Sequence, residues 1–171
     1  SLLIWVYLLA FRGAFWRSAE RLRTASSVRS SWPSVAAVVP ARNEADVISR
    51  SLTSLLEQDY PGPLSVLLVD DHSDDGTAAA ARAAAAASRH PERFSLLQAE
   101  PLPQGWTGKL WALEQGARQA AAEADFIWFS DADIEQPADA LRQLVAKAED
   151  EGREMVSLMV ALSCRGFWER L

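Results

Sequence analysis

Asp131 and Asp133 are the side chains whose types and spacing point most directly to chemistry. They are separated by one residue, and only Ser130 stands between them and an apolar run at 126–129 that is typical of a buried strand. In open α/β sheets, ligands bind beyond the ends of such strands. Two carboxylates this close repel each other unless a cation lies between them, and Mg²⁺ or Mn²⁺ with phosphate oxygens would satisfy both. The alternative is a helix N-cap, because Pro137 and Leu141 indicate a helix that begins nearby.

Two other polar segments follow apolar runs in the same way. The segment 40–44 (Pro-Ala-Arg-Asn-Glu) follows the run 35–39, and the segment 70–77 (Asp-Asp-His-Ser-Asp-Asp-Gly-Thr) follows the run 64–69. Parallel strands end at one edge of their sheet, so these loops and the Asp-x-Asp segment are expected to lie together. The pattern therefore predicts a ligand crevice at that edge.

The elements that must position these loops alternate between strand and helix. Asn43 is expected to cap the first helix, which runs to Gln58. Strands are expected at 35–39, 64–69, 94–97, 126–129 and 155–162, and further helices at 78–87, 109–122 and 138–151. Crossovers of this length suit parallel pairing, so the prediction is an α/β fold with an open, mostly parallel, doubly wound sheet.

The first 33 residues have a different character from the rest of the chain. Residues 2–11 are continuously apolar, but a helix needs about 20 apolar residues to span a bilayer. We interpret residues 1–16 as a partial transmembrane or interfacial helix and residues 17–33 as a basic juxtamembrane linker. The positive-inside rule then places the remainder of the chain in the cytoplasm.

Charge and cysteine content narrow the classes of partner. Residues 30–171 hold 12 Lys or Arg and 22 Asp or Glu, a formal charge of −10. Such a body is a poor binder of nucleic acid, because phosphate neutralisation needs Lys and Arg. The single cysteine, Cys164, excludes an internal disulfide. Without a His partner nearby in sequence, it is expected to be a buried thiol rather than a nucleophile.

From residue 35 to residue 160, this order of motifs resembles the family 2 glycosyltransferases of the GT-A fold. More narrowly, the segments 11–16, 102–113 and 156–160 resemble the hopene-associated glycosyltransferases of bacterial hopanoid gene clusters. The resemblance implies an inverting, metal-assisted transfer of a sugar from a nucleotide-diphosphate donor, a UDP-sugar, to a lipid or lipid-linked acceptor. It also implies a place at the bacterial inner membrane, with the catalytic domain in the cytoplasm, and a role in hopanoid biosynthesis.

The resemblance assigns roles to residues of the three polar segments and of the helix at 109–122. Asp71 corresponds to the residue that hydrogen-bonds the base, and Lys109 to one that lies near the donor. Asp133 corresponds to the ligand of Mg²⁺ or Mn²⁺, and Asp131 to the residue that contacts the ribose or the metal. The full donor site expected on this basis is Pro40, Ala41, Arg42, Glu44, Asp71, Lys109, Asp131 and Asp133.

Structural roles are the alternative for several of these polar residues. Turn chemistry suits Asp70 as well as ligand binding does, and Lys109 could be a solvated surface lysine. Asp74, Asp75 and Gly76 are expected only to start the next helix. His72 is expected to be a loop residue, and Trp111 is expected to pack rather than to line a site.

The general base is not expected within this chain. In the family that it resembles, a carboxylate base lies in the acceptor half, well after the Asp-x-Asp segment. The base is therefore expected beyond Leu171, and Glu169 is not assigned that role. Residues 34–171 are expected to form the nucleotide-sugar part of a domain that is truncated before its acceptor half.

Other functions remain as alternatives. A membrane-tethered domain that binds a nucleotide or a partner helix without turnover would show no acceptor chemistry, even with the acceptor half restored. A sugar-phosphate nucleotidyltransferase is disfavoured, because the segment 40–44 lacks the glycine-rich loop of that class. A dinucleotide-dependent dehydrogenase is disfavoured as well, because no Gly-x-Gly-x-x-Gly follows either early strand.

Overall fold

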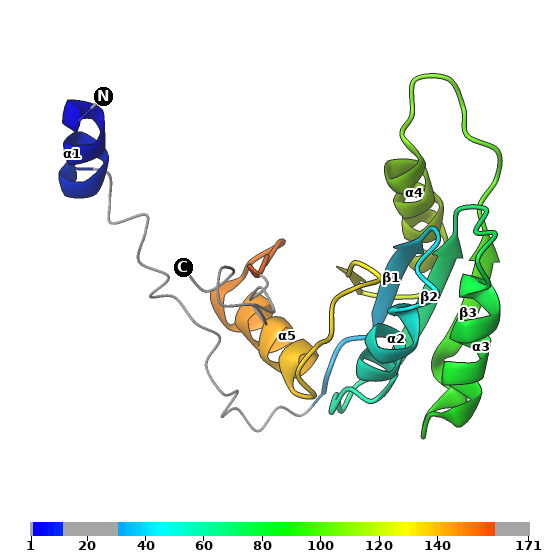
Figure 1. The fold of residues 1–171 in the computed structure, drawn as a ribbon. Helices are drawn as coiled ribbons and strands as arrows, with labels where there is room; N and C mark the ends of the chain where they lie inside the picture. The colour runs from blue at the N-terminus through cyan, green and yellow to red at the C-terminus, as the bar shows by residue number, and fades with distance from the viewer. Residues whose placement is uncertain (1, 12–30, 160–171) are drawn as a thin grey trace.

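The computed structural model describes residues 2–11 and 31–159, and its centre is a sheet of four parallel strands (Figure 1). The strands lie in the order β3-β2-β1-β4. They are β1 (Val35–Ala41), β2 (Leu64–Asp70), β3 (Phe94–Gln98) and β4 (Phe126–Phe129). In register, Val35 pairs with Leu64 of β2 on one side and with Phe126 of β4 on the other. The predicted α/β fold with a parallel sheet is confirmed.

Helices cover both faces of the sheet. The helices α2 (Ile48–Leu56) and α3 (Thr77–Ala87) pack on one face, against Val39 and Leu68 among others. Helix α4 (Gly108–Ala120) packs on the opposite face, against Val38 and Val69. The 3₁₀ turn η1 (Pro91–Arg93) leads into β3, and α5 (Ala140–Glu151) packs near the start of β1. The sheet is therefore doubly wound, as the alternation of elements predicts.

Burial on two faces explains the composition of β1. All seven of its residues are buried, which is why it is continuously apolar rather than alternating. On the α4 face, a Cβ added to Gly116 would lie 2.4 Å from Cγ1 of Val38. The absence of a side chain at residue 116 thus lets α4 lie close against β1.

Two of the expected elements differ in the structure. Residues 155–159, expected to begin a strand, are in neither helix nor strand, and residues 160–162 lie outside the described part. Met155 and Met159 are 84% and 98% exposed, so this apolar run has not packed against the described sheet. Asn43 does not cap α2, which begins at Ile48 with Val47 at its N-cap. The side chain of Asn43 is instead engaged by the neighbouring loop.

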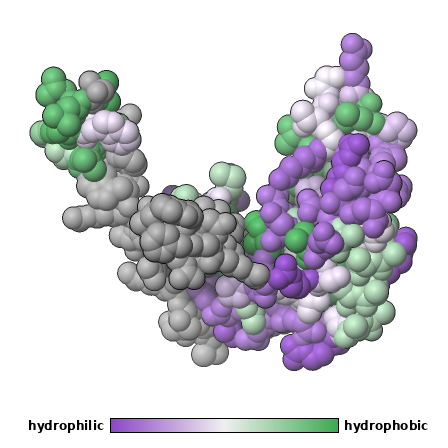
Figure 2. All heavy atoms as spheres, in the orientation of Figure 1, coloured by the Kyte–Doolittle hydropathy of each residue, from purple (hydrophilic) through white to green (hydrophobic). Residues whose placement is uncertain are grey.

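The N-terminal apolar segment is a helix, α1 (Leu2–Phe11), with no buried residue (Figure 2, upper left). No helix among the described residues is long and apolar enough to cross a membrane. Membrane association of α1 therefore remains a prediction. The predictions for residues 12–16 of the N-terminal helix, for residues 17–30 of the basic linker and for Cys164 lie outside the described residues.

Candidate functional site

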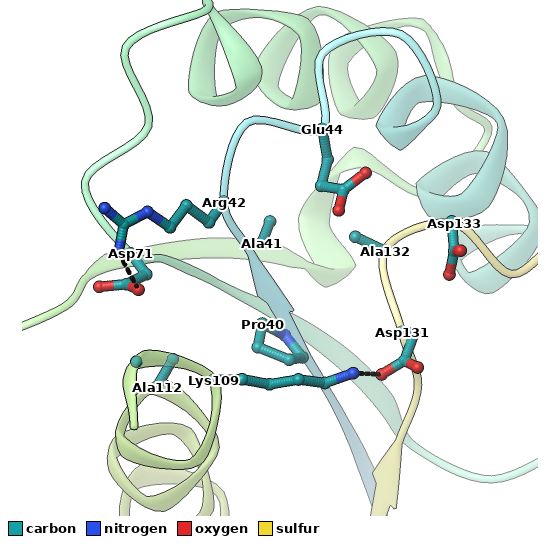
Figure 3. A pocket seen from close by; sticks show the side chains of 11 residues that line it. Pro40, Ala41, Arg42, Glu44, Asp71, Lys109, Ala112, Asp131, Ala132 and Asp133 are labelled. Atoms are coloured by element: carbon teal, nitrogen blue, oxygen red, sulfur yellow. Dashed lines mark hydrogen bonds and ion pairs between the residues drawn. The ribbon is translucent and has the colours of Figure 1, made fainter. Parts of the chain in front are cut away.

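An open pocket of about 350 Å³ lies at the carboxyl edge of the sheet. Its walls come from the loops after β1, β2 and β4 and from the first turns of α4 (Figure 3). The lining residues are Pro40, Ala41, Arg42, Glu44, Asp71, Gly108, Lys109, Ala112, Asp131, Ala132 and Asp133. The structure thus brings together all eight residues that the resemblance assigns to the donor site, while the part that each plays in binding remains a prediction.

Strand order explains why the pocket forms at this place. From β1 the chain winds to β2 and β3 on one side, and it then crosses to β4 on the other side of β1. Pocket residues follow all three adjacent strands: Arg42 after β1, Asp71 after β2 and Asp131 after β4. The winding reverses between β1 and β4, and such reversals are the usual ligand crevices of open α/β sheets.

Two ion pairs cross the pocket (Figure 3). Nη1 of Arg42 lies 3.2 Å from Oδ2 of Asp71, whose side chain is only 12% exposed. Nζ of Lys109 lies 2.7 Å from Oδ1 of Asp131, and both of these side chains are about half exposed. Glu44 and Asp133 make no side-chain hydrogen bond or ion pair with any described residue. The pocket therefore holds two carboxylates that are paired with a cationic side chain, Asp71 and Asp131, and two that are uncompensated by such a partner.

The loop after β1 is fixed by the loop after β2. Asn43 has a positive φ of 56°, its N–H donates to Oγ of Ser73 and its Oδ1 accepts from the N–H of Asp74. The N–H of Ala45 donates to a carboxylate oxygen of Asp75. These bonds hold the backbone on both sides of Glu44. Sequence reasoning did not find that Asn43 joins these two loops, although Asn is one of the few residues that adopt a left-handed conformation readily.

Asp75 is the charged member of this connection. The hydroxyl of Thr77 and then the backbone N–H of Ala45 donate to its carboxylate and lower its pKa below the usual value. Asp75 also accepts the N–H of Thr77, the first residue of α3. Its expected part in starting that helix is confirmed, but the expectation that it does nothing else is wrong, because it also accepts the N–H of Ala45 in the loop after β1.

The Asp-x-Asp loop is held by α2 and by the segment directly after it, through residues that sequence reasoning did not single out. Oγ of Ser54 accepts the N–H of Gln136 at 2.9 Å. The buried Gln58 donates to the carbonyl of Pro137 and accepts the N–H of Leu141, at 2.7 and 2.9 Å. Buried polar side chains are normally paired in this way. The only sequence signal for these contacts was that polar residues lie on and directly after an otherwise apolar helix.

Gly108 is a second residue that sequence reasoning did not assign. It begins α4, and a Cβ placed on it would lie 2.4 Å from Oδ2 of Asp71. The helix start can approach this carboxylate only because residue 108 lacks a side chain. Its position directly before Lys109, at a helix start, was the available signal.

The alternatives proposed from the sequence can now be compared with the structure. Helix capping by Asp131 or Asp133 is wrong, because α5 begins at Ala140 with Asp139 at its N-cap. Asp70 accepts the N–H of Ser73 and has a turn role. Trp111 is buried, with its Nε1 donating to the carbonyl of Glu100, so its expected packing role is confirmed.

The same comparison covers the two remaining residues. His72 is a loop residue, as expected, and its Nδ1 lies 3.4 Å from Oδ1 of Asp71. Lys109 is not merely a solvated surface lysine, because its ammonium lies in the pocket against Asp131.

The pocket fits a divalent cation only when the ligand supplies part of the coordination. No group of three or more His, Cys, Asp or Glu that could hold a metal occurs within residues 2–11 and 31–159. Asp131 and Asp133 provide at most two carboxylates. Mg²⁺ characteristically binds through one or two carboxylates together with substrate phosphates and water. These residues therefore suit a cation that is shared with a phosphorylated ligand.

Comparison with known proteins gives one family and several solved structures. The model of glycosyl transferase family 2 matches residues 36–170. The mannosyltransferase PcManGT from Pyrobaculum calidifontis, solved with GDP-Man and Mn²⁺, is 34% identical with a TM-score of 0.58, and the match covers 70% of this chain and 33% of that chain. TarS from S. aureus, solved with UDP-GlcNAc, is 26% identical with a TM-score of 0.54 and coverages of 70% and 32%.

The matches cover only part of each solved structure. The chain spans about a third of the length of the solved proteins that it matches. No curated protein sequence matches it.

Proposed function

The chain belongs to glycosyl transferase family 2, whose model matches residues 36–170, and on this premise we propose that the protein transfers a sugar from a nucleotide-diphosphate donor to a lipid or lipid-linked acceptor. The proposed transfer is metal-assisted and inverts the configuration of the sugar. The pocket at the carboxyl edge of the sheet is the proposed donor site.

The charge of the pocket is the observation that carries this proposal. Its charged side chains are two cations, Arg42 and Lys109, and four carboxylates, so the lining has an excess of two negative charges. A nucleoside diphosphate is itself anionic and would be repelled by such a lining. One divalent cation would neutralise the excess and provide the attraction. A phosphorylated donor and a divalent cation are therefore expected to bind together.

We assign the donor's parts to the pocket residues as follows. Asp71, fixed by Arg42 and by the start of α4, accepts a ring N–H of the base, because an ionised carboxylate only accepts hydrogen bonds. Asp133 and Asp131 hold Mg²⁺ or Mn²⁺, and Lys109 faces the diphosphate. The cation, when bound, stabilises the negative charge that develops on the departing nucleoside diphosphate.

The acceptor hydroxyl must lose a proton during transfer, which calls for a carboxylate base. We assign this role to no residue of the pocket and place it, by resemblance, in the acceptor half that follows the Asp-x-Asp segment. A domain that binds nucleotide without turnover would present the same donor pocket. An assay of sugar transfer by the whole protein separates the two functions, because only an enzyme releases free nucleoside diphosphate in proportion to acceptor.

Nucleotide binding should depend on both the base and the metal. We expect UDP to bind the chain in the presence of Mn²⁺ and at least roughly tenfold more weakly without it. CDP should bind more weakly than UDP, because N3 of cytosine, unlike N3 of uracil, carries no hydrogen to donate to Asp71. Calorimetric titration of UDP, GDP and CDP, each with and without Mn²⁺, measures this. A preference for GDP would support a nucleotide-diphosphate donor, but it would mean that the base is guanine rather than uracil. Absence of binding by the folded protein under every condition would refute the donor site.

We also propose that α1 associates with the bacterial inner membrane and holds the donor site on its cytoplasmic side, near a lipid acceptor. The support is the exposure of its apolar side chains: Leu3 is 83% exposed and Phe11 75% exposed. Transfer of such an apolar surface from water into a lipid interface is favourable. A role in hopanoid biosynthesis rests on the sequence resemblance.

The membrane proposal predicts vesicle binding that depends on α1. The chain should float with phospholipid vesicles, and replacing Leu3 and Ile4 by glutamate should reduce the bound fraction at least tenfold, because both side chains are exposed on α1. A matched replacement of Leu158 and Met159, which are also exposed but lie outside α1, serves as the control. Equal losses in both variants, or flotation unaffected by either, would contradict a membrane role for α1.

A further inference from the structure

The ion pair between Lys109 and Asp131 differs in kind from the other ion pair of the pocket. The Arg42–Asp71 pair lies where Gly108 closes on the carboxylate, and the Asp71 side chain is only 12% exposed. In the Lys109–Asp131 pair, the side chains are 59% and 49% exposed, with 2.7 Å between Nζ and Oδ1. A pair this accessible to water contributes little to folding stability. Its partners can therefore separate at low cost when a competing ion reaches them.

Separation of this pair would affect cation binding, because of where the pair lies. Asp131 is one of two carboxylates in the Asp-x-Asp segment that could hold a cation, and Asp133 has no partner among the described residues. Figure 3 shows the Lys109 side chain extending from α4 across the pocket to Asp131, with Asp133 beyond it. While the pair is closed, an arriving cation meets only one uncompensated carboxylate of this segment and an ammonium that repels it.

We propose that Lys109 is a positioning residue that acts as a built-in counter-ion for Asp131 and makes binding of the metal depend on the nucleotide. Without a nucleotide, Lys109 occupies the Oδ1 side of Asp131 and weakens the cation site. When the diphosphate enters, Lys109 leaves Asp131 for a phosphate oxygen, and Asp131 becomes free to hold the cation with Asp133. The proposal rests on the proposed function of this pocket.

Coupling of this kind is reciprocal. A nucleoside diphosphate that raises the affinity for Mn²⁺ must itself bind more tightly, by the same factor, when Mn²⁺ is present. Part of this coupling is inherent in a cation that contacts both protein and phosphate. The part due to Lys109 is the penalty that its ammonium imposes on the cation in the absence of nucleotide. That penalty can be measured with the metal alone.

The test measures the affinity of the chain for Mn²⁺ without nucleotide, by electron paramagnetic resonance of the free ion. Lys109→Gln is expected to bind Mn²⁺ roughly two- to fivefold more tightly than the wild-type chain, the range expected for an exposed ion pair. Lys109→Arg, which keeps the charge and can still reach Asp131, should stay near the wild-type affinity. Arg42→Gln removes the other cation of the same pocket, which pairs with Asp71 instead, and should give a clearly smaller gain.

Several outcomes would overturn the proposal. They are an unchanged Mn²⁺ affinity in Lys109→Gln, an equal gain in Arg42→Gln, or no Mn²⁺ binding by either the wild-type chain or Lys109→Gln. An equal gain would mean that the lysine acts only through the general charge of the pocket.

A second titration separates this proposal from the proposed function. Mn²⁺ is titrated with and without saturating UDP, and the increase in Mn²⁺ affinity that UDP causes is compared between wild type and Lys109→Gln. A smaller increase in the variant supports the counter-ion role, and an equal increase opposes it. If the metal-only gain appears but no nucleoside diphosphate binds, the proposed donor site and the coupling to nucleotide both fail, and only the pairing of Lys109 with Asp131 against the cation is supported.

Discussion

Replacing Asp133 by alanine is expected to weaken Mn²⁺-dependent binding of the nucleoside diphosphate by at least roughly 100-fold. Loss of a residue that merely supports a metal ligand typically costs 10- to 100-fold in metal affinity, so loss of a direct ligand should cost no less. Asp133 is also the one carboxylate of the Asp-x-Asp segment with no partner among the described residues, so no local ion pair would offset the loss. In the whole enzyme, the transfer rate should fall roughly 10²–10³-fold.

The control for this experiment is Glu135→Ala. Glu135 is an exposed carboxylate two residues further along the same loop, and it does not line the pocket. Its removal changes the net charge by the same amount as removal of Asp133, but it takes away no proposed ligand. The calorimetric titration is repeated on both variants with and without Mn²⁺. If Asp133→Ala keeps the wild-type affinity, or if both variants lose affinity equally, Asp133 is not a metal ligand.

The fold could be predicted because its signals are local and repeated. Each of the four strands is a short apolar run, and the alanine-rich segment that forms α3 is the strongest helix former in the chain. The strand order was not predictable in this way. It depends on α4 crossing to the opposite face of the sheet, where Gly116 permits close packing against Val38. Such a contact joins residues far apart in the sequence and leaves no local pattern.

The expectations that failed show the same limit. Asn43 has the composition of a helix N-cap, but its side chain binds the backbone of Asp74, 31 residues further along the chain. The apolar run at 155–159 has the composition of a strand and pairs with no described strand. In both cases the residue type restricts what the segment can do, and the partner available in space decides what it does.

The pocket residues were predictable to the extent that they follow strands. The chemistry of Asp71, Asp131 and Asp133 is visible in the sequence because these carboxylates follow apolar runs, at the strand ends where open α/β sheets bind ligands. The side chains that fix the loops of these carboxylates are ordinary polar residues, such as Ser54 on α2 and Gln58 just after it. The significance of Gly108 likewise depends on a distance that only the folded chain defines.

Gly108→Ala is expected to weaken nucleotide binding roughly tenfold to hundredfold while leaving the fold intact. The added Cβ would lie 2.4 Å from Oδ2 of Asp71, well inside van der Waals contact. Relieving an overpacked contact of this kind typically costs about 1–3 kcal/mol, and each 1.4 kcal/mol is tenfold in affinity. This free-energy cost should appear as weaker nucleotide binding, because the Asp71 carboxylate must move away from Arg42 and from its proposed position against the base.

The backbone conformation at residue 108 indicates that the loss of nucleotide affinity would be steric. Alanine is a better helix former than glycine by about 1 kcal/mol, and the φ of Gly108 is not in the positive range that disfavours a side chain. Substitution should therefore preserve α4 or slightly stabilise it. A thermal unfolding midpoint close to that of the wild-type chain, together with a reduced affinity for UDP in Mn²⁺, is the expected pair of results.

A double-mutant cycle with Asp71→Ala identifies the contact responsible. Removing the Asp71 carboxylate also removes the atom that the new methyl group would meet, whereas Arg42 Nη1 lies at an ordinary contact distance of 3.7 Å from it. In the Asp71→Ala background, Gly108→Ala should therefore change the UDP affinity by less than about twofold, since residues in direct contact give strongly non-additive effects. If Gly108→Ala costs the same factor in both backgrounds, the loss arises elsewhere at the helix start. The close approach of α4 would then not be what positions Asp71.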